Sequence, residues 1–136
     1  MESEKILSIA AENGHLKVFE FLLPKIEDKN PQLTSPHPSS TPLHIATKNG
    51  YENIVRFILD NDIEDKNPPD EVGKTPLHIA VKEGYSNLVE MLFNEAGDKN
   101  PAMTNGLTPL HLAAQYGDID TIKLIYPEVL SIFTLI

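Results

Sequence analysis

The 136-residue sequence contains no cysteine, and only 11 of its side chains are lysine or arginine. Without cysteine, neither a disulfide framework nor a zinc site with thiolate ligands can form. Because 20 acidic side chains outnumber the basic ones, the net charge is −9. Such a field repels phosphate backbones and anionic lipid headgroups. We therefore expect no binding of nucleic acid or membranes, and we expect a protein partner with a basic or mixed surface.

Long apolar runs are absent as well, and none approaches the length of a bilayer crossing. The N-terminal residues MESEK lack the basic start and apolar stretch of a secretion signal. These absences favour a cytoplasmic location and leave the nucleus open. Hydrophobic residues make up 40% of the chain, which is enough for a core of its own at the size of one domain.

Two four-residue words are each written three times in the chain. Thr-Pro-Leu-His begins at residues 41, 75 and 108, and Asp-Lys-Asn-Pro begins at residues 28, 65 and 98. The first word recurs after 34 and 33 residues, and a divergent copy begins at Lys5. Repetition at such a period is typical of a stacked repeat architecture. We predict one domain, 1–136, made of four units at about 3–30, 39–67, 73–100 and 106–136.

Each unit has the pattern of two short helices and a turned connection. Thr followed by Pro begins a helix well, because the hydroxyl accepts from a free backbone N–H and Pro at the first position loses no bond. A glycine about two turns later, such as Gly84, can end that helix in the left-handed conformation. A second helix follows with apolar residues at helical spacing, for example Ile54 and Ile58. One such pair cannot bury its apolar face alone, so the pattern predicts an all-α repeat solenoid.

The stretches GKTPLHIAVKEGYSNLVEMLFNEAGDKN and GLTPLHLAAQYGDIDTIKLI are the most complete copies of the unit. Both resemble ankyrin repeats, and the resemblance covers nearly the whole chain. It implies antiparallel helix pairs with β-hairpin-like fingers on one side, and binding of other proteins through the fingertips and the concave face of the first helices. The first unit lacks the Thr-Pro-Leu-His start, and the last has Tyr126-Pro127 where its second helix should finish. These units look like capping units or like a cut through a longer array.

The repeated histidines, His44, His78 and His111, occupy one position in successive units. The resemblance implies that they form hydrogen bonds within and between repeats, whereas a metal site would require the three to converge. His15 is at a position where later units have tyrosine, and we expect it to pack. His37, in the inserted finger, is expected to be a solvated loop residue. The asparagines of Asp-Lys-Asn-Pro match a position that is hydroxylated in some members of the family, and a turn-stabilising role is the alternative.

Signatures of catalysis are missing from the sequence. It contains no P-loop, no glycine-rich dinucleotide fingerprint and no zinc-protease pair. A stack of helix pairs offers a groove rather than the enclosed cleft that a catalytic pair requires. We expect no enzymatic activity, no cofactor and no metal.

The family's contact positions, carried over to this sequence, give a candidate partner-binding surface on the first helices and the fingers. Its members are Lys48, Asn49, Glu71, Val72, Lys74, Lys82, Glu83, Thr104, Asn105, Leu107, Gln115 and Tyr116, with Glu12 and Asn13 at the same place in the first unit. Tyr116 beside Leu107 is the expected apolar anchor, since aromatic residues are enriched where binding energy concentrates. The enlarged finger, residues 34–40, either reaches toward a partner or is a tolerated insertion.

The C-terminal stretch YPEVLSIFTLI carries a single charge, Glu128. Because terminal repeats need a polar outer face, we expect this tail to pack back on the fourth unit, or to be buried in a partner or in a second copy. Pro127 predicts that the last helix ends near Tyr126.

Three classes of function remain open at this point. The first is a protein-binding module, the second is a regulatory or targeting segment of a larger enzyme, channel or ligase adaptor, and the third is an engineered binder on a repeat scaffold. Insertions of one and three residues and drift of the framework argue against design. The full-length reading frame would separate the first two.

Overall fold

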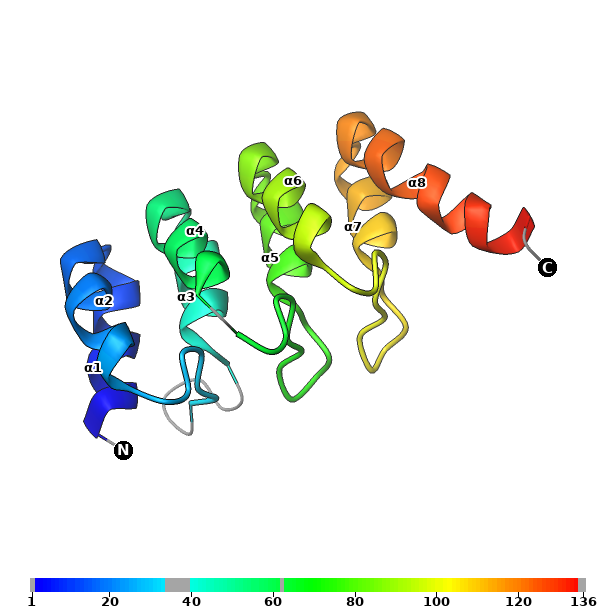
Figure 1. Cartoon of the computed structure of the whole chain (residues 1–136). Coiled ribbons are helices and arrows are strands. Elements are labelled where there is room, and N and C mark those ends of the chain that lie inside the picture. Colours follow the sequence, from blue (N-terminus) through cyan, green and yellow to red (C-terminus); the bar gives the residue numbers. More distant parts are fainter. Residues whose placement is uncertain (1, 34–39, 62, 135–136) are drawn as a thin grey trace.

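The computed structural model describes residues 2–33, 40–61 and 63–134. Within these residues it contains eight α-helices and no strand, arranged as four helix pairs in a row (Figure 1). This arrangement confirms the predicted all-α solenoid. The inserted finger lies outside the described residues except for Ser40, and so does His37. The helices are α1 Glu2–Asn13, α2 Leu16–Leu22, α3 Pro42–Lys48, α4 Glu52–Asp60, α5 Pro76–Glu83, α6 Ser86–Glu95, α7 Pro109–Tyr116 and α8 Ile119–Thr134, with a 3-10 turn η1 at Leu23–Lys25.

The word Thr-Pro-Leu-His begins α3, α5 and α7 in the same way. The threonine hydroxyl accepts a hydrogen bond from the backbone N–H of the histidine, at 3.2–3.3 Å. The histidine Nδ1 accepts in return from the backbone N–H of the threonine, at 3.1 Å. Histidine thus takes the place that Glu or Gln has in a capping box. At the other end of α5 and α7, Gly84 and Gly117 adopt the left-handed conformation that stops the helix.

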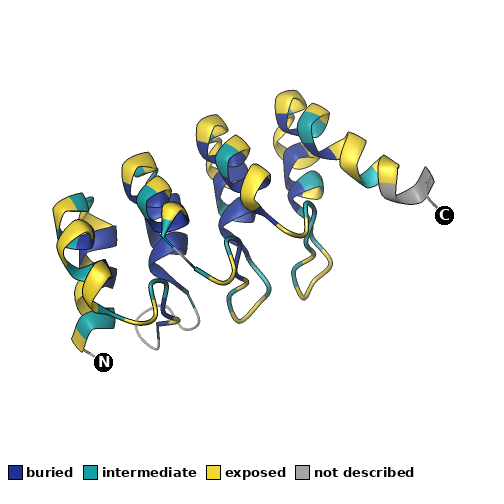
Figure 2. Cartoon of the chain, in the orientation of Figure 1, coloured by how far each residue is buried: buried dark blue, intermediate teal, exposed yellow. Residues whose placement is uncertain are grey.

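The core runs along the whole row, because each helix pair packs against the next. The first helices contact one another in the order α1, α3, α5, α7, and the second helices do so in the order α2, α4, α6, α8. Figure 2 shows the buried residues gathered on these inner faces. A buried alanine recurs on each first helix, where a small side chain lets neighbouring units approach closely: Ala10, Ala46, Ala80 and Ala113.

The word Asp-Lys-Asn-Pro joins one unit to the next. Its aspartate Oδ1 accepts from the backbone N–H of the asparagine, at 2.9–3.1 Å. The asparagine Oδ1 accepts from a leucine N–H in the first turn of the next first helix, at 3.0–3.1 Å. This bond satisfies one of the N–H groups that a helix start leaves free. The turn-stabilising role of Asn30, Asn67 and Asn100 is therefore confirmed.

The lysine of the same word differs between units. Lys99 Nζ donates to the carbonyls of Phe93 and Asn94 at the end of α6, where a cation also matches the helix dipole. Lys29 donates in the same manner to carbonyls of η1 and the residue that follows it. Lys66 instead forms an ion pair with Glu95 of the next unit, with 3.4 Å between nitrogen and oxygen.

The last helix departs from the prediction, because α8 continues through Pro127 to Thr134. A proline inside a helix lacks an N–H and its ring opposes the carbonyl four residues earlier. Helix continues on both sides because each flank packs against the core, with Ile125 before Pro127 and Val129 after it. The predicted end near Tyr126 is therefore wrong.

The described part of the C-terminal tail does not fold back on the fourth unit. Tyr126 and Leu130 are exposed, although Val129 contacts the core. The side chains of residues 132–136 lie outside the part that the structure describes. None of the described helices combines the length and the apolar character that a membrane crossing requires.

Candidate partner-binding groove

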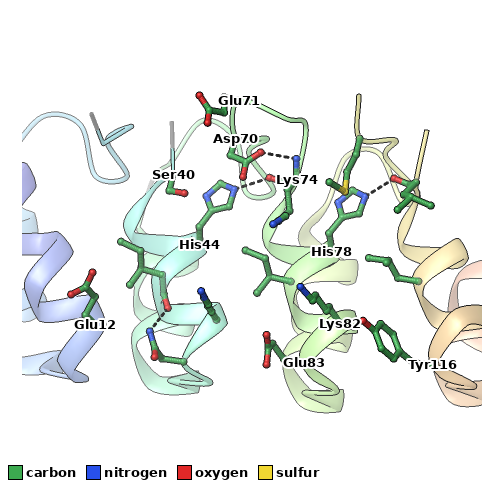
Figure 3. Close-up of a pocket in the computed structure, with 17 residues that line it drawn as sticks. Glu12, Ser40, His44, Asp70, Glu71, Lys74, His78, Lys82, Glu83 and Tyr116 are labelled. Atoms are coloured by element: carbon green, nitrogen blue, oxygen red, sulfur yellow. Dashed lines mark hydrogen bonds between the residues drawn. The ribbon is translucent and has the colours of Figure 1, made fainter. Parts of the chain in front are cut away.

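A groove with a volume of about 800 Å³ lies between the first helices and the fingers (Figure 3). Residues from all four first helices and from the two described fingers line it, together with Ser40 of the enlarged finger. Eight of the twelve predicted contact residues are among them: Lys48, Asn49, Glu71, Lys74, Lys82, Glu83, Leu107 and Tyr116. The other four, Val72, Thr104, Asn105 and Gln115, are exposed but do not line the groove.

The floor of the groove is apolar, and the family's contact positions did not include most of it. Ile45, Ile79 and Leu112 follow the motif histidine directly in three successive units, and Met103 adds to them from a finger. Ile45 and Leu112 are buried, while Ile79 and Met103 are half-buried. The sequence carries this signal as an aliphatic residue after every Thr-Pro-Leu-His. An aliphatic residue on a short helix usually belongs to the core, so the pattern alone does not mark it as groove lining.

The helix side of the groove is formed by the last turns of the first helices. Lys48, Lys82, Glu83 and Tyr116 are exposed there, and Figure 3 shows the last three along the helices, away from the fingers. Asn49 is tied to its own helix, because its side-chain amide donates to the Ile45 carbonyl at 2.9 Å. This side therefore offers charged and aromatic groups above the apolar floor.

The two described fingers are tight turns closed by backbone hydrogen bonds. The Asp70 N–H donates to the Lys74 carbonyl, and the Met103 N–H donates to the Leu107 carbonyl, both at 2.8 Å. Each turn has a glycine at positive φ, 79° at Gly73 and 87° at Gly106. Other residues are strained in this backbone conformation. These bonds fix the shape of each finger before any partner arrives.

Neighbouring fingers are also joined to each other. The Thr104 N–H donates to the Val72 carbonyl at 2.9 Å, and the Thr104 hydroxyl reaches the same oxygen at 3.3 Å. The Asn105 Oδ1 accepts from the Leu107 N–H at 3.1 Å. Thr104 and Asn105 are thus used within and between the fingers, which explains why they stay away from the groove.

The motif histidines connect each first helix to the finger of the next unit. His44 Nε2 donates to the Lys74 carbonyl at 2.9 Å, and His78 Nε2 donates to the Leu107 carbonyl at 3.0 Å. Because Nδ1 of each ring accepts from a backbone N–H, the proton is on Nε2 and the ring is neutral. Burial lowers the pKa of both imidazoles below the ordinary value of 6.5, against a smaller opposing effect of the carbonyl bonds. The hydrogen-bonding role predicted for these two histidines is therefore present.

His15 does not pack as expected, because it is exposed. In the next two units the equivalent Tyr51 and Tyr85 lay their rings on a glycine of the preceding unit and donate to a carbonyl of its first helix at 3.3 Å. His15 belongs to the first helix pair of the row, and the described residues contain no earlier helix pair that could receive its ring. Its exposure follows from position rather than from residue type.

Leu107 also differs from the expectation of an exposed anchor. Its side chain is half-buried and packs against the core, while Tyr116 remains about half exposed at 52%. Both line the groove, so Leu107 belongs to its floor and Tyr116 to its rim.

The groove is much closer to electrical neutrality than the molecule as a whole. Four acidic residues, Glu12, Asp70, Glu71 and Glu83, face three lysines, Lys48, Lys74 and Lys82. The lining therefore carries −1 of the net charge of −9. Most of the acidic excess lies elsewhere on the surface. Among the described residues, no three histidine, aspartate or glutamate side chains come close enough to hold a metal ion together.

Comparison with known families agrees with this architecture. The family model described as ankyrin repeats in three copies matches residues 7–103, and the model of a single ankyrin repeat matches residues 105–128. A search of curated proteins gives no significant match. With four stacked helix pairs and two family matches that together span most of its length, the chain belongs to the ankyrin repeat family.

Proposed function

We propose that this chain is a non-catalytic binding module that holds an extended segment of a partner protein in the groove. Ankyrin repeats are generally protein–protein interaction modules. The observation that carries the proposal is the groove itself, with its apolar floor, its charged rim and fingers fixed by hydrogen bonds. A preformed site lowers the ordering cost of binding.

The charges around the groove indicate which side chains a bound segment of the partner would carry. On the helix side Lys48 and Lys82 stand beside Glu12 and Glu83, and on the finger side Asp70 and Glu71 outnumber Lys74. A segment that fits has an apolar side chain for the floor, an acidic group for a lysine of the helices and a basic group toward the fingers. This is a partner of mixed charge, and the acidic field of the rest of the molecule raises its association rate at low salt when its overall charge is positive.

The state of the two histidines in the groove supports a binding role over a catalytic one. Histidine is the side chain that most often acts as a general base, and His44 and His78 both line the groove. Both nitrogens of each ring are already hydrogen-bonded, one to the capping threonine and the other to the next finger. A general base needs a free nitrogen within reach of its substrate.

Selection from a library of random peptides of about twelve residues tests the proposal without a known partner. We expect enriched peptides to share an apolar residue between an acidic and a basic one. Tyr116→Ala should weaken their binding by about 30-fold, the cost of an aromatic hot spot. When the library is selected against Lys82→Glu, the enriched peptides should carry a basic residue where the wild-type chain selects an acidic one.

Controls come from the outer helices, where Arg56 and Glu90 are exposed and remote from the groove lining. Arg56→Ala and Glu90→Ala should leave peptide binding unchanged. If these two substitutions abolish binding while Tyr116→Ala and Lys82→Glu have no effect, the binding surface is on the other side of the stack and the groove proposal is wrong.

A further inference from the structure

Exposed large apolar side chains are concentrated at the two ends of the row. Eight of them are exposed in the described part of the chain; Val72 alone lies in a middle unit, and Tyr116 on α7 lines the groove. The other six are on α1, α2 and α8, in the first and last units: Ile6, Ile9, Phe21, Ile119, Tyr126 and Leu130. Figure 1 places these two units at opposite ends of the molecule.

At the first unit, these residues occupy positions that are covered in the other units. Aligning the units by their repeated words sets Phe21 against Phe57 and Ile6 against Pro42. Phe21 is 67% exposed, although the Lys25 ammonium lies 4.0 Å from its ring centre, whereas Phe57 is half-buried. Ile6 is 42% exposed, whereas Pro42 is buried. Among the described residues, a helix pair precedes each later unit and none precedes the first.

At the last unit, three residues are more exposed than the residues at the same positions in the preceding units. Tyr126 is 50% exposed, whereas its equivalents Leu59 and Phe93 are 2% and 6% exposed. Ile122 is half-buried, whereas Val55 and Val89 at that position are buried. His111 is exposed, although the other two motif histidines are buried. Among the described residues, a helix pair follows each of units one to three and none follows the fourth.

These two surfaces are therefore the two halves of one interface, which the chain itself forms three times between its own units. We name the first the leading face, Ile6 and Phe21, and the second the trailing face, His111, Ile122 and Tyr126. We propose that the leading face of one copy of this chain stacks on the trailing face of another. The occupant is a second copy because it carries the matching half of an interface whose packing is already present in the molecule.

The geometry of this association is head to tail. Each copy uses a different face, so the contact is heterologous and leaves one face free at each end of a pair. A third copy can add to either end, and the assembly grows with concentration rather than stopping at a closed dimer. The groove lies along the side of the row and stays open in such an assembly, so the proposal does not depend on the proposed function.

The test uses two variants that each block one face, Phe21→Glu and Tyr126→Glu. Both side chains are at least half exposed, so circular dichroism should show an unchanged fold. By light scattering and sedimentation over micromolar to millimolar concentrations, wild type should exceed the 15.1 kDa of one chain, and each variant alone should stay at that mass. Mixed in equal amounts, the variants should form a complex of two chains that grows no further, because the mixture has one intact pair of faces.

Other results would exclude head-to-tail stacking. A wild-type chain that stays monomeric up to millimolar concentration would overturn the proposal. So would a Phe21→Glu variant that keeps the wild-type mass while Tyr126→Glu is monomeric, since that outcome means that α8 pairs with α8 of a second copy. Val72→Glu is the matched control, because Val72 is an exposed apolar residue that belongs to neither face, and it should behave as wild type.

Discussion

We expect the free energy of unfolding to fall steadily as the pH is lowered from about 7.5 to about 5.5, because His44 and His78 are held neutral in the folded chain. Burial lowers the pKa of each imidazole, with Asp70 and Lys74 acting in opposite directions nearby. On unfolding, both rings return to water and to a pKa near 6.5. Below that pH the unfolded chain therefore binds more protons than the folded one.

The sign and size of the effect follow from this difference in bound protons. Stability is at its full value above the unfolded pKa and is lost as the pH falls toward the lowered folded pKa. Each histidine contributes a slope of at most about 1.4 kcal/mol per pH unit in that window, so the two together contribute at most about 2.7 kcal/mol per unit. Protonation at Nδ1 would also end its acceptance from the threonine N–H, which removes one of the two hydrogen bonds of the cap.

Urea unfolding at a series of pH values measures this slope, and His111 offers a matched control. His111 has the same place in the capping word but is exposed. His111→Gln should keep the wild-type slope between about pH 7 and pH 5.5, while the double variant His44→Gln, His78→Gln should lose most of it. If the double variant keeps the slope, or if His111→Gln removes it, the argument from burial is refuted.

Three further predictions concern the repeated framework. At neutral pH, His78→Ala should lower stability by about 1–3 kcal/mol, since it leaves buried hydrogen-bond partners unpaired, and a chelator should leave the melting temperature of wild type unchanged. Gly73→Ala should cost at least about 1–2 kcal/mol, because its φ of 79° is strained for other residues and a Cβ would lie 3.0 Å from the backbone of the next finger, whereas Gly97→Ala, with open space around it, should cost less. Asn67→Ala should cost about 1–3 kcal/mol by freeing a buried helix N–H, while exposed Asn53→Ala should be nearly neutral; equal effects of the two in thermal melts would contradict this.

The framework could be predicted from the sequence because it depends on short-range bonds that are repeated. The capping of α3 by Thr41 and His44 involves residues three positions apart, and the Asx turns involve residues two positions apart. Such bonds form wherever the word occurs. Periodicity then requires the units to stack, since a single pair leaves its apolar face in water.

The features that were missed depend on contacts between units. Leu107 is half-buried because the finger folds its side chain toward the core, and no local pattern distinguishes it from an exposed fingertip residue. His15 is exposed because it belongs to an outermost unit, although its position is a packing position in the others. The path of α8 through Pro127 also depends on tertiary packing, with Ile125 and Val129 held by the core on either side.

The two repeated words serve the architecture of the stack, and the residues that differ between units along the groove form the proposed recognition surface. Thr-Pro-Leu-His caps a helix and reaches forward to the next finger. Asp-Lys-Asn-Pro closes a turn and reaches forward to the next helix start. Both words therefore connect a unit to its successor, which explains why they recur at the period of the stack. Along the groove, by contrast, the position of Lys48 is held by Glu12, Lys82 and Gln115 in the other units. Variation at a place that the framework does not constrain is what a binding surface on a repeated scaffold requires, because only those side chains can change without loss of the fold.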